Sequence, residues 1–100
     1  GSYQIHLSLP GKDCEATCAS HIGTCTDQGL AEINACHVLE QHAKCDGCEH
    51  SMGADQPAIV NADAPADKKP GSCLINSEMP TCMGAHSMTR RLCACTPKAR

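Results

Sequence analysis

The chain has 100 residues, ten cysteines, a single tyrosine with no phenylalanine or tryptophan, and a formal net charge of −3. Isoleucine, leucine, valine and phenylalanine together number only 13, too few for apolar burial alone to offset the entropy lost on folding. The weak negative charge and the lack of aromatic side chains exclude nucleic-acid binding, which needs a basic surface and rings for base stacking.

Disulfide bonds are the expected substitute for the missing core. A short chain this rich in cysteine is typical of a disulfide scaffold, which persists only in an oxidising compartment. We therefore expect no free thiols and a secreted, extracellular or secretory-lumen location. The pairing stays open, because ten cysteines allow about 945 connectivities. The expected framework comprises Cys14, Cys18, Cys25, Cys36, Cys45, Cys48, Cys73, Cys82, Cys93 and Cys95.

The domain organisation is simple. We expect a single domain over residues 3–97, with Gly1-Ser2 as a cloning remnant in front and a short tail over 98–100. No signal peptide is visible, and no apolar run approaches the length that spans a bilayer. The sequence therefore predicts no membrane insertion.

The first half of the chain predicts a strand and two helices. Residues 3–9 alternate between apolar and polar, which indicates a half-buried strand. Asp13 is a suitable N-cap for a helix over 14–22, followed by Gly23. A longer helix is expected from Asp27 to about residue 43, with a turn over 44–48.

The second half is less regular. Strands are expected at 58–60, at 73–75 and near 90–95, separated by a long exposed loop at about 61–72. The helix spacing places Cys14 and Cys18 on one face, and the strand spacing does the same for Cys93 and Cys95. Together the elements predict a small disulfide-rich α+β fold with two helices packed on a short antiparallel sheet.

The cysteine spacing carries a family resemblance. The chain opens with Cys14-x3-Cys18-x6-Cys25, continues through Asn34, and closes with Cys82-Met-Gly-Ala-His-x6-Cys93-x-Cys95, with Arg-Arg-Leu just before Cys93. In this order the pattern resembles the cysteine-rich C-terminal segment of the N-acetylglucosaminyltransferase V family, Golgi enzymes that add a branching N-acetylglucosamine to N-glycans. The resemblance covers about residues 14–95.

The departures limit what the resemblance implies. The middle of the chain holds extra cysteines at positions 36, 45 and 48, which suggest an additional bridge. No Rossmann-like βαβ repeat or phosphate-binding helix start lies within the chain, so no catalytic residue and no cofactor carries over. The resemblance implies an accessory module that is not itself an enzyme.

The best candidate binding surface lies within the closing motif. Cysteines at both ends should clamp this segment, so that little entropy is lost on binding, and its arginines could recognise carboxylates or acidic sugars. The reading that we favour for this segment is nevertheless structural: a glycine turn, a histidine that caps a local backbone group, and arginines paired with Asp or Glu of the same domain. The candidate residues are Gly84, Ala85, His86, Arg90 and Arg91.

A zinc site is the weaker alternative for the middle of the chain. His42, Cys45, Cys48 and His50 have side chains that zinc accepts, but no second Cys-x-x-Cys follows them. Structural disulfides are the favoured reading, and we expect no bound metal.

Three functions remain open. The leading expectation is a non-catalytic secreted or lumenal module that belongs to a larger protein and recognises a glycan or a protein surface. The alternatives are a purely structural accessory domain of a glycosyltransferase-like parent, and a stand-alone secreted effector or inhibitor. An exposed apolar patch would favour binding, whereas only Tyr3 could stack on a sugar ring.

Overall fold

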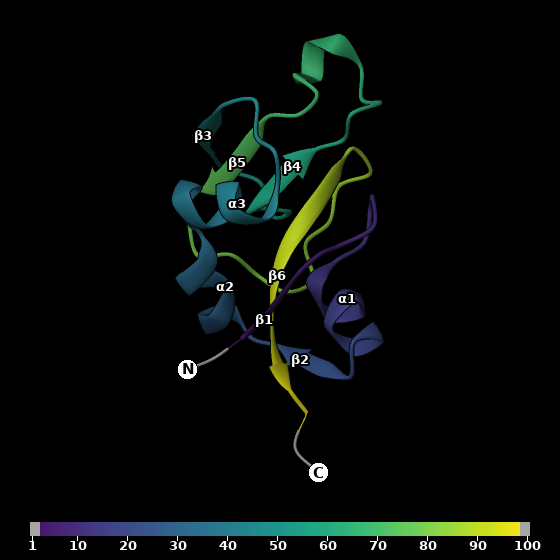
Figure 1. Ribbon diagram of the computed structural model, residues 1–100, viewed down its shortest axis with the longest axis vertical. Helices are drawn as coiled ribbons and strands as arrows, with labels where there is room; N and C mark the ends of the chain where they lie inside the picture. Colours follow the sequence, from purple (N-terminus) through teal and green to yellow (C-terminus); the bar gives the residue numbers. More distant parts are fainter. Residues whose placement is uncertain (1–2, 99–100) are drawn as a thin grey trace.

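The computed structural model describes residues 3–98 and shows a small disulfide-rich α+β fold (Figure 1). Its helices are α1 (Cys14–Ser20), α2 (Asp27–Ile33), α3 (Cys36–His42) and the short 3-10 helix η1 (Ala66–Lys68). Its strands are β1 (Gln4–Leu7), β2 (Gly23–Cys25), β3 (Cys48–Ser51), β4 (Ala58–Val60), β5 (Cys73–Asn76) and β6 (Thr89–Pro97). The predicted remnant at Gly1-Ser2 and the last two residues of the predicted tail lie outside the described residues.

Strand β6 is the central element of the sheet, because three other strands pair with it. It is the longest strand in the described part of the chain, and it pairs antiparallel with β1, β2 and β4 (Figure 1). The sheet continues from β4 through β5 to β3, and β3 pairs with β5 in parallel. The sheet is therefore mixed, where the sequence predicted an antiparallel one. The difference arises from β3, which the sequence analysis had placed partly within a turn.

A side-chain cap explains where α1 begins. The Asp13 carboxylate accepts a hydrogen bond from the Ala16 amide at 2.7 Å, as expected for the N-cap of α1. At the other end, the left-handed residue is Ile22, with a φ of 55°, and not the following glycine. A β-branched residue is unusual in this region, and the Ile22 side chain is also exposed.

The predicted helix over 27–43 is two helices. Asn34 ends α2 because its side chain turns toward β5, where it pairs with the backbone of Asn76. Its amide nitrogen donates to the Asn76 carbonyl at 2.8 Å, and its oxygen accepts from the Asn76 amide at 2.7 Å. Ala35 is then extended before α3 starts. A long-range contact thus overrides a local helical pattern.

The five disulfides fall into two groups. The first three cysteines pair with the last three, as Cys14–Cys93, Cys18–Cys95 and Cys25–Cys82. The four middle cysteines pair among themselves, as Cys36–Cys48 and Cys45–Cys73. Every described cysteine is oxidised. Cysteines also make up half of the buried core cluster, and Leu30, Leu39 and Leu92 are its largest fully buried apolar side chains.

The predicted loop over 61–72 is mostly exposed and carries the single 3-10 turn of η1. No helix within residues 3–98 combines the length and the apolar character that a membrane crossing requires.

We predict that the two disulfides between α1 and β6 act cooperatively. With Cys14–Cys93 intact, Cys18–Cys95 closes only a small additional loop, so losing one bridge leaves most of the constraint. Replacing one pair by alanine should therefore lower the free energy of unfolding by less than half of the loss caused by replacing both pairs. The loss in the double variant should exceed the sum of the two single losses by roughly 1 kcal/mol. Denaturant unfolding of the two single-bridge variants and the double variant measures this excess, and strict additivity would contradict the prediction.

Candidate functional site

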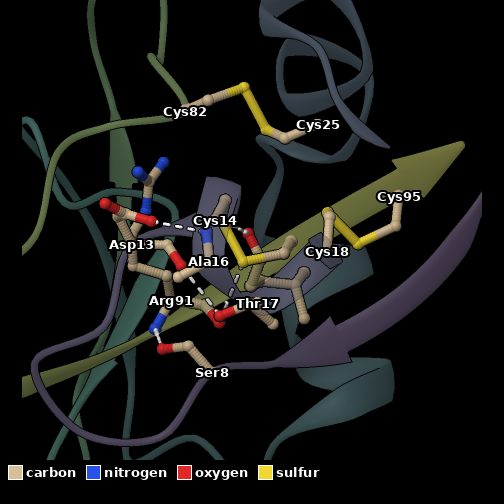
Figure 2. The surroundings of a disulfide bond; sticks show 12 residues. Ser8, Asp13, Cys14, Ala16, Thr17, Cys18, Cys25, Cys82, Arg91 and Cys95 are labelled. Atoms are coloured by element: carbon tan, nitrogen blue, oxygen red, sulfur yellow. Dashed lines mark hydrogen bonds between the residues drawn. A yellow bond between two sulfur atoms is a disulfide. The ribbon is translucent and has the colours of Figure 1, made fainter. Parts of the chain in front are cut away.

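The predicted binding segment is clamped as expected. Cys82 is bonded to Cys25 beside α2, while Cys93 is bonded to Cys14 on α1. Figure 2 shows α1 lying against the strand that carries Arg91 and Cys95, with the Cys25–Cys82 bridge above it. The segment between the two clamps is therefore fixed to the end of β2 at one side and to α1 at the other.

Arg91, however, is an interior residue and cannot belong to an exposed binding surface. Its side chain is fully buried. One terminal nitrogen donates to the carbonyls of Thr81 at 2.6 Å and Gly84 at 2.7 Å, and the other donates to the Gln56 carbonyl at 3.3 Å. Its backbone amide donates to the Ser8 hydroxyl at 2.8 Å (Figure 2). Arg91 thus holds three loop carbonyls together.

The positive charge of Arg91 is compensated by carboxylates that do not form an ion pair with it among the described residues. Burial lowers the pKa of its guanidinium, and the nearby carboxylates of Asp55, Asp13 and Asp27 oppose that shift. Asp55 is itself buried and accepts a hydrogen bond from the Thr89 hydroxyl at 2.7 Å. The guanidinium therefore has a structural role: it is a buried charged group surrounded by polar atoms.

The other candidate residues have mixed roles. Arg90 is half-buried, and its Nε donates to the Ser8 carbonyl at 2.9 Å. Gly84 packs so closely on the backbone of Ala54 that any Cβ at position 84 would overlap it. Ala85 and His86 are exposed, and the Nδ1 atom of His86 accepts from the Met88 amide at 3.1 Å.

His86 borders a small cleft of about 180 Å³ between the start of β6 and the loop that carries η1. Apolar side chains form much of its wall, and Lys68 and the buried Asp55 also line it. Of the five predicted binding residues, only His86 lines this cleft. The structure therefore does not assemble the five residues into one surface.

The zinc alternative fails because its sulfur atoms are already bonded. Cys45 is joined to Cys73, and Cys48 is joined to Cys36, so neither offers a thiolate to a metal ion. Residues 3–98 contain no group of three or more histidine, cysteine or acidic side chains placed to hold a metal.

Exposed methionines form a surface that the sequence analysis missed. Met52, Met79 and Met83 are 74%, 65% and 73% exposed, and we call them the methionine surface. Met52 and Met79 line one cleft of about 280 Å³. Met83 precedes Gly84, which packs on Ala54, a residue that lines that cleft. Unbranched methionines at irregular spacing give no periodic signal, so composition alone could have pointed to them.

Hydrogen bonds of Asn76 connect the segments beneath the methionine surface. The Asn76 side chain donates to the Gly53 carbonyl at 2.9 Å and accepts from the Glu78 amide at 3.0 Å. The Asn76 backbone is bonded in turn to Asn34. These contacts tie three loops to the end of β5, so the methionines project from a fixed frame.

A pair of stacked histidines joins β1 to the end of α1. The ring centroids of His6 and His21 are 3.6 Å apart and the ring planes differ by 5°. Burial and the neighbouring His21 lower the pKa of His6. The Nε2 atom of His6 is buried and has no hydrogen-bond partner in the described part of the chain.

Comparison of the chain with models of known protein families gives no match, and comparison with curated proteins gives none either.

We predict opposite outcomes for the two neighbouring arginines. Arg91→Ala should lower the free energy of unfolding by about 3 kcal/mol, because it leaves buried carbonyls without their donor. Arg90→Ala, the matched control, should cost less than about 1 kcal/mol, since one hydrogen bond at a half-buried position is lost. Denaturant unfolding measures both, and equal effects would contradict the interior role of Arg91.

We also predict that acid destabilises the fold through His6. Because folding lowers the pKa of His6, the native state binds fewer protons than the unfolded chain. The free energy of unfolding should therefore decrease as the pH falls below the ordinary histidine value of about 6.5, and level off only below the native pKa. His6→Gln should flatten this slope between pH 7.5 and 5.5, whereas the exposed control His50→Gln should keep it. An unchanged slope in His6→Gln would contradict the prediction.

Proposed function

We propose that the chain is a non-catalytic, protein-binding module of the secretory pathway, and that the methionine surface is its contact surface. The observation that carries the proposal is the exposure of three of the four methionines in a chain so poor in large apolar residues. Burial of these methionine side chains in the interior would stabilise the fold more, yet the side chains lie at the surface. Methionine is enriched at protein interfaces, where its flexible thioether adapts to a partner.

The position of the one tyrosine supports a protein partner over a glycan. The Tyr3 ring is half-buried against Gly29 of α2, and its hydroxyl interacts with Glu32. It is therefore not free to stack on a sugar ring, and the described residues contain no other aromatic ring of that kind.

The charge beside the methionine surface favours a particular partner chemistry. Glu78 lines the same cleft as Met52 and Met79, and no lysine or arginine lines it. A complementary partner would present an apolar surface with a lysine or arginine at its edge.

The disulfide pairing supports a self-contained module. The opening and closing motifs that resemble the N-acetylglucosaminyltransferase V segment pair with each other, so these two anchors form one cross-linked unit. Five disulfides also fit an oxidising environment, either the secretory lumen or the extracellular space. We propose on this basis an accessory domain that works beside a larger parent protein.

The test replaces all three surface methionines with serine. Met52→Ser, Met79→Ser and Met83→Ser together should leave the melting temperature nearly unchanged, because the side chains are exposed. A photo-crosslinker at position 79, introduced in secretory cells, should capture a protein partner that the soluble wild-type domain displaces and the triple variant does not.

The matched control is the Leu9→Ser, Ile22→Ser variant, whose two side chains are 69% and 78% exposed on a different part of the fold. It should displace the partner as the wild type does. Equal displacement by the triple methionine variant would overturn the proposal, as would glycan-array binding that survives the methionine changes.

A further inference from the structure

A groove of about 370 Å³ runs between α1 and the residues that follow β1. It is separate from the methionine surface, and none of its lining residues lines the methionine cleft. Its polar wall holds two nitrogen-bearing side chains and three hydroxyls. These are Lys12, His21, Ser8, Thr17 and Ser20.

The three hydroxyls are already committed as donors to backbone carbonyls. Ser8 donates to the Leu9 carbonyl at 2.9 Å, Thr17 to Asp13 at 2.8 Å, and Ser20 to Thr17 at 2.7 Å. They can still accept hydrogen bonds, but they have no further proton to offer. The donors free to meet a ligand are therefore those of Lys12 and His21.

Both of these donors are accessible. Lys12 and His21 are exposed, and neither belongs to an ion pair within residues 3–98. They come from different segments, the turn after β1 and the end of α1, yet they line one groove. Two nitrogen donors that line one groove and form no ion pair with a described acidic side chain can together bind an oxyanion.

Charged groups reach the surroundings of the groove from α1 and from β6. On α1, the Asp13 carboxylate is occupied as the N-cap and Glu15 is exposed. On β6, Arg90 adds a positive charge beside the Ser8 carbonyl. Lys12 and Arg90 are therefore balanced by Asp13 and Glu15, and the net charge near the groove becomes positive when a histidine gains a proton.

His6 lies directly behind His21 in the stacked pair. A proton on His21 faces a second imidazole at 3.6 Å, so protonating both rings brings two like charges together. A bound anion at the open side of His21 would offset that repulsion. Ligand binding and proton binding should therefore favour each other.

We propose that this groove binds a sulfate or phosphate group, held by Lys12 and a protonated His21, and that binding strengthens as the pH falls. The groove is larger than the oxyanion alone, so it also accommodates the sugar or side chain that carries the group. The site is independent of the proposed protein-binding function, because it uses other residues on another part of the fold.

Inorganic sulfate is the most direct probe, because it stays doubly charged from pH 5 to 8 and any pH dependence then belongs to the protein. Titration with sodium sulfate, against sodium chloride at matched ionic strength, is followed by NMR at pH 5.5 and 7.5. The expected shifts are confined to the residues around Lys12, Ser20 and His21, with severalfold tighter binding at pH 5.5.

Variants assign the two donors. His21→Gln should abolish the pH dependence, and Lys12→Ala should weaken binding at both pH values. Lys44→Ala and His50→Gln, which change exposed residues elsewhere, should leave the affinity unchanged. Shifts spread evenly over all lysines and histidines, or a pH dependence that persists in His21→Gln, would overturn the proposal.

Two sugar esters then separate the sources of the oxyanion. Galactose 6-sulfate and galactose 6-phosphate are compared with free galactose at the same concentrations. Tighter binding of either ester, lost in His21→Gln, supports the site and identifies its preferred group. An equal response to free galactose would overturn it. The triple methionine variant should bind sulfate normally, so failure of the protein-binding proposal would be seen separately.

Discussion

The double cross-link between α1 and β6 is the constraint on which the rest of the structure depends. Cys14 and Cys18 are one helical turn apart, a rise of about 6 Å, while Cys93 and Cys95 are two strand residues apart, a rise of about 6.6 Å. These two spacings match closely, so both bridges can form side by side and fix the helix on the strand. The helix can then neither slide nor rotate on the strand.

Much of the remaining fold follows from that fixed contact. Strand β6 is held in place by α1, and it then supplies pairing partners for β1, β2 and β4. Arg91 lies on the same strand, and its guanidinium draws in the carbonyls of Thr81, Gly84 and Gln56. A chain with so few large apolar residues thus organises its interior with disulfide bonds and a buried arginine. That interior leaves the methionines free for the surface.

Local signals in the sequence predicted local structure well. Asp13 as an N-cap, the alternating first strand and the strand at 58–60 were all confirmed, because each depends on neighbouring residues. The break at Asn34 and the parallel strand β3 were not predicted, because both depend on pairing with β5 far along the chain. The disulfide pairing could not be predicted either, although the spacing did predict that Cys14 and Cys18 share one face and that Cys93 and Cys95 share another.

The candidate site shows the same limit. Arg90 and Arg91 are adjacent and chemically identical, and charged side chains are rarely fully buried, so the sequence placed both at the surface, either in a binding site or paired within the domain. Only the three-dimensional structure shows that Arg91 is interior and Arg90 half-buried. Likewise, the stacking of His6 on His21 joins a strand to a helix end, and no spacing rule connects those positions.

The central claim is that disulfides replace the hydrophobic core, and thermal unfolding with and without a reductant tests it most directly. The oxidised chain should unfold in one cooperative transition, and the fully reduced chain should show none, because its apolar burial cannot offset the entropy of the freed chain. A cooperative transition that survives complete reduction, verified by mass spectrometry of alkylated thiols, would contradict the account.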